Sequence, residues 1–419
     1  MPTSQQSKRE AFWIVLVILS LTKVALDDGI VRYASPTSSW TDLWTKSGWE
    51  CDSPSMLNST RTEMGATTPQ SEESQYVETA EPQKGSQQHQ PAPPRSTVSL
   101  PKWLQDYLAW HRQVRRELAD GASLDNYRFF ILRCRHEDKK CAGAADRLKA
   151  IPHALVLCHQ TKRVLLIHWE KPAPLEEFLV PPVDGLDWRV PEGLLTNRSV
   201  ATVGFKKADS KKQFLSHPAP LVGVKTLLGT YYDEQRQRSE PTLHQVFGTL
   251  WQVMFQPSPP VQALLDQTMT ELDLTPGRYV ATHVRSLYVQ NKTGDEVNAL
   301  RCATELQGPN ATLFFTSDSA ATTQRAVDFA ATHHLDVRAR PDHEPVHLDR
   351  GRDFLQNSND WKNHHASAYY NVFVDLMLLA QAECVAYGAG GYGLLGSRLS
   401  YRPSCSINHR RNTCKGKWK

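Results

Sequence analysis

The amino-acid sequence predicts an α/β protein with two Rossmann-like domains that face a cleft, preceded by a membrane anchor and a polar stem. Strand and helix patterns alternate in residues 127–168 and again in residues 279–399, which is typical of parallel sheets. Residues 30–98 show almost no apolar periodicity. The length of 419 residues accommodates two domains of ordinary size and a tail.

The N-terminus carries an export signal. Lys8 and Arg9 precede an apolar run from Ala11 to Leu21, and a basic region before such a run directs secretion. The run is short for a spanning helix, which needs about 20 residues, although Lys23 can snorkel to the interface. A cleaved signal peptide and an uncleaved anchor both fit. The long polar segment that follows favours the anchor, so we expect residues 1–29 to form a cytosolic tail and signal anchor.

Residues 30–98 are rich in Ser, Thr, Gln, Pro and Glu, and such a composition cannot bury enough apolar surface to offset chain entropy. We expect a disordered stem here. Export also agrees with four N-glycosylation sequons, at Asn58, Asn197, Asn291 and Asn310.

The eight cysteines form no Cys-x-x-Cys pair and no zinc pattern. In an oxidising lumen, Cys134–Cys141 and Cys405–Cys414 are plausible short-loop disulfides. Cys158 and Cys384 lie in apolar runs, so buried free thiols are an alternative for these two.

The first domain is expected at residues 99–265. Its apolar pattern predicts a βαβ unit, and hence a parallel sheet. The expected elements are a helix at 103–118, a strand at 127–132, a cysteine-containing loop, a helix at 144–160 that Pro152 interrupts, and a strand at 163–168.

The second domain is expected at residues 266–419, after a proline-rich segment at 255–261. It repeats the alternation and ends in a glycine loop, Gly388–Gly393. The expected elements are helices at 262–272, 320–333, 366–382 and from 394, and strands at 279–284, 312–316, 335–338 and 384–387.

Ligands of open parallel sheets bind beyond the carboxyl ends of the strands. His283 and Arg285 close a buried strand there, and alternation places both on one side. The guanidinium fork of Arg285 suits phosphate oxygens, which predicts a diphosphate clamp. An Arg held in an ion pair at the sheet edge is the alternative.

The glycine loop precedes a helix, where bare N–H groups attract anions. Ser397, just beyond the loop, would add a donor, although a plain tight turn also fits. Asp318 follows another strand and would either accept from a base or sugar or cap the next helix.

In the first domain, Gly143, Asp146 and Arg147 occupy the equivalent strand-to-helix position and are expected to face the cleft, or to form an ordinary helix start. Other site types are excluded or weak. The sequence has no Asp-x-Asp, no P-loop and no Gly-x-Ser-x-Gly elbow. The histidines of segments 342–347 and 364–365 are expected in solvated loops. The net charge of +4 does not indicate a nucleic-acid binder.

Together these segments resemble the fucosyltransferase superfamily that shares a His-x-Arg motif, which includes α1,2-, α1,6- and protein O-fucosyltransferases. The resemblance covers residues 133–402 and runs through Gly143–Leu148, Arg163–Trp169, Pro276–Arg285, Phe315–Asp318, Val374–Leu379 and the glycine loop. It departs from many relatives at Ser286 and Leu287, where they have a second Arg and a Gly-Asp, and at Gly390 and Gly391, where they have Ser or Thr.

The resemblance implies a GT-B fold and transfer of fucose from GDP-fucose to a glycan or protein hydroxyl, with inversion and without a metal or other cofactor. Arg285 would grip the diphosphate, and Gly390, Gly391 and Tyr392 would contact its phosphates. His283 and Asp318 would lie near the guanine. Glu296 is a candidate base, with Glu170 and Asp295 as other candidates. A non-catalytic lectin-like or pseudoenzyme module and a different nucleotide sugar are the alternatives. The expected location is the Golgi membrane, as a single-pass type II protein with a luminal catalytic domain, or else the ER lumen or secretion after cleavage.

Overall fold

The computed structural model describes Arg95 and residues 98–138, 141–196, 198–202, 216–225, 246–286, 294–308, 310–343, 345–348 and 364–416. The expected tail, signal anchor and nearly all of the stem lie outside these residues, as do Cys51, Leu287 and the sequons at Asn58, Asn197 and Asn291. Within the described ranges, no helix combines the length and hydrophobicity that a membrane crossing needs. All of the described residues belong to one unit, residues 86–419.

The first lobe is built on a parallel sheet in the order β2-β1-β5-β4. Its elements are α2 (Lys102–Ala119), η1 (Leu124–Asn126), β1 (Phe129–Cys134), α3 (Ala144–Leu148), α4 (Ile151–Thr161), β2 (Val164–Trp169), η2 (Leu175–Glu177), β3 (Leu179–Val180), β4 (Ala201–Thr202), β5 (Leu221–Lys225), α6 (Phe247–Met254) and β6 (Gln256–Pro257). Every residue of β1 is buried, as expected of a strand covered on both faces. Pro152 opens α4, where its missing N–H is not needed, so the predicted helix is indeed divided there.

The second lobe carries a five-stranded parallel sheet in the order β11-β10-β7-β8-β9. Its elements are α7 (Pro259–Glu271), β7 (Val280–Val284), α8 (Asp295–Gln307), β8 (Leu313–Ser317), α9 (Ala320–Thr332), β9 (Val337–Ala339), η4 (Ala366–Tyr369), α10 (Tyr370–Gln381), β10 (Cys384–Tyr387), α11 (Gly391–Leu399), η5 (Pro403–Cys405) and β11 (Ile407–Asn408). The central strand β7 ends directly before Arg285, so the sheet itself determines where this side chain begins.

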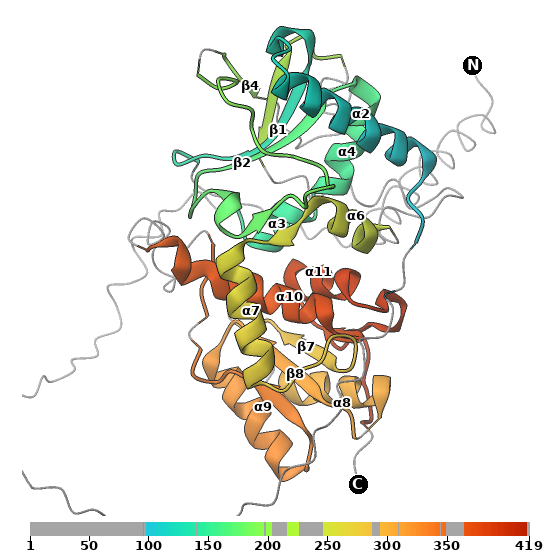
Figure 1. Ribbon diagram of the computed structural model, residues 1–419. Coiled ribbons are helices and arrows are strands. Elements are labelled where there is room, and N and C mark those ends of the chain that lie inside the picture. Colours follow the sequence, from blue (N-terminus) through green and yellow to red (C-terminus); the bar gives the residue numbers. More distant parts are fainter. Residues whose placement is uncertain are drawn as a thin grey trace, which may run out of the picture. The chain divides into compact units, whose positions relative to one another are not determined.

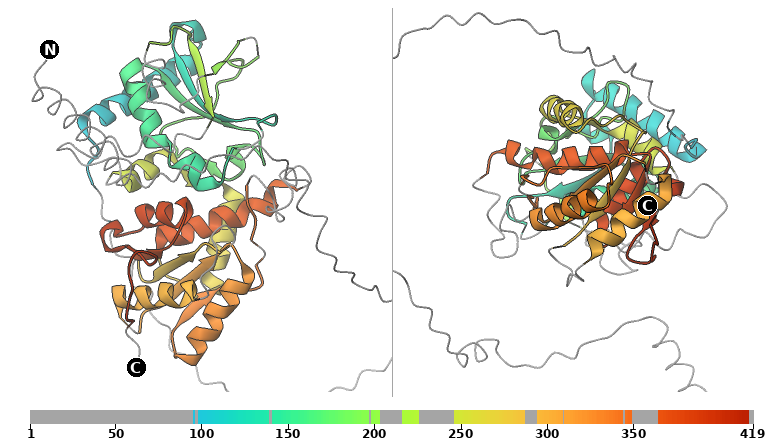
Figure 2. Two further views of the ribbon diagram at one scale, coloured as in Figure 1. Left: turned by 180° about the vertical axis from the view of Figure 1, so that it is seen from behind. Right: turned by 90° about the horizontal axis from the view of Figure 1, so that it is seen from below.

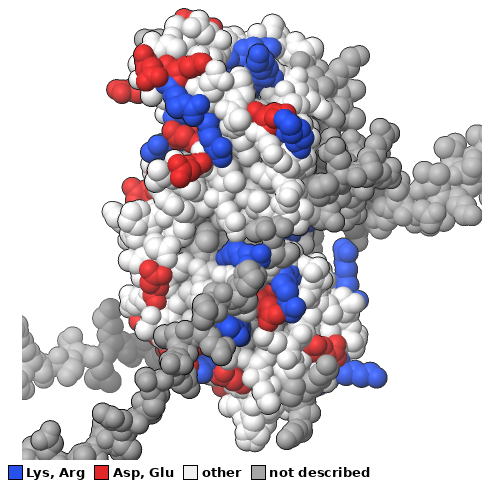
Figure 3. Space-filling model, turned by 45° about the vertical axis from the view of Figure 1, so that its right-hand side comes forward, with Lys and Arg blue, Asp and Glu red and all other residues white. Residues whose placement is uncertain are grey.

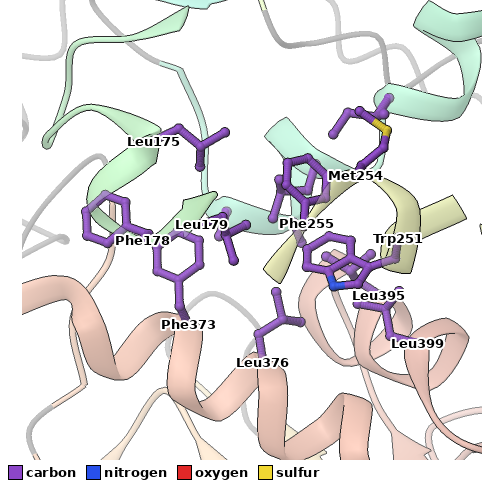
Figure 4. Close-up of a cluster of buried hydrophobic side chains, with 14 of the residues drawn as sticks. Leu175, Phe178, Leu179, Trp251, Met254, Phe255, Phe373, Leu376, Leu395 and Leu399 are labelled. Atoms are coloured by element: carbon purple, nitrogen blue, oxygen red, sulfur yellow. The ribbon is translucent and has the colours of Figure 1, made fainter. Parts of the chain in front are cut away.

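The two lobes share one apolar core. Helices α10 and α11 lie between the two sheets (Figure 1; Figure 2), and their buried faces meet the underside of the first lobe. Phe178 of the first lobe stacks on Phe373 of α10, with ring centroids 4.5 Å apart and planes 7° from parallel. Figure 4 shows the cluster around this pair, including Leu175, Leu179, Trp251, Met254, Phe255, Leu376, Leu395 and Leu399.

Three disulfides join described residues. The predicted Cys134–Cys141 bond is confirmed. The predicted Cys405–Cys414 bond is wrong, because β10 and the chain after it bring Cys405 to Cys384, while Cys414 reaches Cys302 on α8. Cys384 is therefore not a free thiol, whereas Cys158 is free and buried.

Candidate functional site

A pocket lies where the carboxyl ends of β7 and β8 meet the start of α3. It contains about 870 Å³ of empty space, part of which is open to solvent. Its walls come from both lobes: Gly143, Ala144, Ala145, Asp146, His283, Arg285, Thr316, Ser317, Asp318, His343, Pro345, Val346, His347, Leu348, Asn371, Val372, Asp375, Gly391 and Tyr392.

Arg285 and Asp318 stand side by side at the pocket because β7 and β8 pair in parallel, with Val284 opposite Ser317. Arg285 Nε lies 3.9 Å from Asp318 Oδ2, and the backbone N–H of Ser286 donates to Asp318 Oδ1 over 2.5 Å. Asp318 does not cap the following helix, since the Ser319 hydroxyl accepts from the Thr322 N–H at 3.4 Å instead. Asp318 thus holds the segment that carries the guanidinium.

The glycine loop supports Arg285 from the other side. Gly390 is the N-cap of α11 and has φ +85°, a conformation that favours glycine. A Cβ at this position would lie only 2.7 Å from Arg285 Nη1, so the guanidinium packs directly against the backbone of the loop. Gly390 therefore contributes to the site by packing against Arg285, although it does not itself line the pocket.

His283 also lines the pocket, on the same side of β7 as Arg285, as alternation predicts. Burial, with smaller contributions from His409 and Arg285, lowers the pKa of His283 to about 3. The imidazole is therefore neutral at physiological pH, and its Nδ1 has no hydrogen-bond partner. Its ring lies 5.3 Å from the ring of Tyr392.

The first lobe contributes Gly143 and Asp146, but the prediction that Arg147 faces the cleft is wrong. Successive helical residues are about 100° apart, so Asp146 and Arg147 cannot share one direction. Arg147 is buried and donates to the carbonyls of Ala142 and Lys171 over 2.8 Å and 2.7 Å. Its guanidinium lies over the ring of Trp169, which is a structural position.

Two further candidates do not line this pocket. Glu296 is buried against the neighbouring helix, where Arg325 Nε donates to its Oε1 over 2.8 Å, so it is poorly placed to act as the base. Ser397 lies in the second turn of α11, too far along to add a donor at the helix start, and its hydroxyl donates to the Leu394 carbonyl over 2.8 Å.

The other candidate bases are also engaged elsewhere. Glu170 Oε2 accepts from the backbone N–H of His136 over 2.9 Å, and Asp295 Oδ2 lies 3.6 Å from Arg410 Nε. Neither residue lines the pocket.

Sequence reasoning missed one wall of the pocket and part of its polar floor. The expectation of solvated loop histidines is wrong for His343 and His347, which line the pocket on either side of Pro345 and Val346. Asp375 was not singled out, yet it also faces the pocket, where its Oδ2 accepts from the Thr316 hydroxyl over 2.9 Å and its Oδ1 pairs with Arg340. A carboxylate in the middle of the apolar helix 366–382 was the available signal, since an aspartate is rarely placed among buried residues unless it has a polar partner.

Among the residues that the structure describes, no three or more His, Cys, Asp or Glu side chains are grouped as a metal site would require.

Comparison with known proteins establishes the fold. No family model matches the chain, and neither does any curated protein sequence. Among solved structures, the chain is similar to a mutant of Arabidopsis thaliana FUT1 in complex with GDP, with a TM-score of 0.51 and 11% identity over 74% of this chain and 79% of that one.

Looser likenesses are to the fucosyltransferase NodZ from Bradyrhizobium (TM-score 0.43, 16% identity, 65% of this chain and 93% of that one) and to POFUT1 in complex with GDP-fucose (TM-score 0.35, 7% identity, 71% and 97%). The fold assignment rests on FUT1 alone, because the other two scores are below 0.5. The predicted α/β fold with two Rossmann-like lobes is thereby confirmed: the chain shares the GT-B fold of FUT1.

Proposed function

We propose that this protein is a glycosyltransferase that transfers fucose from GDP-fucose to a hydroxyl of a glycan or protein, with inversion and without a metal ion. The observation that carries the proposal is the placement of Arg285. Its guanidinium lies in a pocket between two lobes, fixed between Asp318 and Gly390 at the start of a helix.

Such an arrangement suits the departure of a nucleoside diphosphate. As the bond to the sugar breaks, negative charge grows on the diphosphate and positive charge on the ring. Fixed donors aimed at the leaving group lower this barrier, and the N–H groups that open α11 add to the field of Arg285. In this mechanism Arg285 supplies the charge that a divalent cation supplies at an Asp-x-Asp site.

The polar floor of the pocket suits a guanine base. The Asp375 carboxylate is an acceptor, and guanine offers a ring N–H and an amino group side by side, whereas uracil offers a single ring N–H. His283 is neutral and adds an uncharged polar wall. GDP bound to FUT1, which has the same fold, also supports this choice.

The test is a donor panel followed by substitution of Arg285. We expect GDP to raise the melting temperature of the purified protein more than UDP does, and GDP-fucose to be turned over. Arg285→Ala and Arg285→Lys should each lower turnover about 100-fold or more, since one such donor contributes ~3–4 kcal/mol to transition-state stabilisation. The matched control is Arg338→Ala, because Arg338 lies in β9 of the same sheet but pairs with Asp336 outside the pocket.

Each alternative has its own outcome. Stabilisation by UDP alone would favour another donor. GDP binding without transfer would favour the non-catalytic module. Normal turnover in Arg285→Ala would overturn the assignment of the clamp.

For the location, we propose the Golgi membrane in a type II orientation, with the ER lumen or secretion as the alternatives. The basic residues and apolar run at the N-terminus support this, as do the three disulfides, which are typical of proteins folded in an oxidising compartment.

A further inference from the structure

A second cation lies at the rim of the pocket, and it comes from the first lobe. Lys149 directly follows α3, and its ammonium forms an ion pair with Asp146 at 2.5 Å. A Cβ at Gly391 would lie 3.6 Å from Lys149 Nζ and 3.7 Å from Asp146 Oδ1. The pair therefore rests on the first residue of α11, across the junction between the lobes.

Lys149 and Arg285 lie beside successive residues of one loop. Arg285 lies against Gly390 and Lys149 against Gly391, so cations from opposite lobes flank the start of a nine-residue helix. The first N–H groups of such a helix have no carbonyl partner within it and favour negative charge. The buried His283 lines the same pocket, and its unpartnered Nδ1 faces Gly393 in the first turn of this helix.

We propose that Lys149 is a second binding cation for the diphosphate of the donor, and that Asp146 positions its ammonium. This inference rests on the proposed function and adds a specific residue to it. A diphosphate gains negative charge as the sugar leaves, and one guanidinium compensates only part of it. Because Lys149 belongs to the first lobe and Arg285 to the second, a bound diphosphate would attract one cation from each lobe.

The experiment compares two nucleotides that differ by one phosphate. In the full chain, Lys149→Gln should weaken GDP binding about tenfold and GMP binding less than twofold, since a unit charge acts mainly on the phosphate nearest to it. Lys149→Arg should retain most of the GDP affinity. Lys102→Gln is the matched control, because Lys102 also pairs with an aspartate, Asp106, but lies on the exposed face of α2.

The outcomes separate this inference from the proposed function. If the wild-type protein binds no GDP, the proposed function itself fails. If Arg285→Lys weakens GDP binding while Lys149→Gln leaves the GDP-to-GMP affinity ratio unchanged, only the role of Lys149 is overturned. Equal losses of GDP and GMP binding in Lys149→Gln would likewise indicate a structural role and overturn it.

Discussion

At the scale of single residues, the site depends on glycines at the start of α11, where the missing side chain leaves room for other groups. Arg285 fills the space that a side chain at Gly390 would need, whereas a Cβ at Gly391 would be in ordinary contact with Lys149 Nζ at 3.6 Å and Asp146 Oδ1 at 3.7 Å. Gly393 likewise leaves room for His283, whose Nδ1 would lie 2.7 Å from a Cβ there. Charged and polar groups thus approach the backbone of α11 from three sides, close to its unpaired N–H groups.

Gly390→Ala should therefore damage the site through Arg285. The new methyl group would clash with Arg285 Nη1 at 2.7 Å, and φ +85° would strain the alanine as well. We expect turnover of GDP-fucose to fall at least tenfold, accompanied by ~1 kcal/mol of destabilisation from the backbone.

Gly308→Ala separates these two effects. Gly308 has φ +103° but nothing within 4 Å of its would-be Cβ, so this variant should lose similar stability and keep its activity. Denaturation curves and initial rates of both variants give the comparison. Equal activity in the two variants would show that the packing of Arg285 on Gly390 is unimportant.

At the scale of elements, the sequence predicted the longer buried strands, but it missed the helices α6 and α8. The apolar run at β10 was predicted with its observed bounds, and β7 and β8 to within one residue at each end. The short strands β3, β4, β5, β6 and β11 were also missed. All of these except β5 have two residues each, and β5 has a glycine at its centre, so none shows a clear period.

The site was predicted where local rules suffice. Alternation along one strand places His283 and Arg285 together, and no information from elsewhere in the chain is needed. By contrast, the contribution of His343 and His347 depends on how the loop after β9 packs against the first lobe, which no local pattern encodes. The same holds for the partners of Cys302 and Cys384.

The contact between α10 and the first lobe should account for much of the coupling between the lobes. Phe373 is fully buried and stacks on Phe178, so Phe373→Ala removes a large ring from the shared core. We expect the free energy of unfolding to fall by about 3–5 kcal/mol, and GDP affinity to fall with it because the pocket needs both lobes.

Phe329→Ala is the control for this prediction. Phe329 also stacks on a ring, that of His333 at 3.9 Å, but it is only partly buried and lies on α9, away from the lobe interface. We expect a smaller loss of stability and unchanged GDP affinity. If denaturant unfolding gave the same loss of unfolding free energy for both variants, the prediction that the α10 contact couples the lobes would be wrong.

At the scale of the whole molecule, the disulfides of the fold indicate the cellular compartment in which the protein folds. Cys302–Cys414 ties the C-terminal segment to α8 across 112 residues of sequence, and Cys384–Cys405 ties η5 to β10. Both bonds lie within the lobe that carries Arg285. Since cytosolic thiols are kept reduced, this lobe is suited to folding in the secretory pathway, as the proposed location requires.

This orientation can be tested at Asn310, the one sequon whose asparagine the structure describes. Asn310 is exposed in the turn between α8 and β8, and the sequon requires only that the enzyme of the ER lumen reaches it. In eukaryotic cells, the full chain should carry a glycan at Asn310, lost in Asn310→Gln, and the uncleaved N-terminus should remain attached. Mass spectrometry of peptides treated with an N-glycosidase detects both. An unmodified Asn310 together with free thiols at Cys302 and Cys414 would place the lobe in the cytosol and exclude the proposed topology. A glycan at Asn310 on a shortened chain would agree with a luminal location but would show that the N-terminal segment is a cleaved signal and not an anchor.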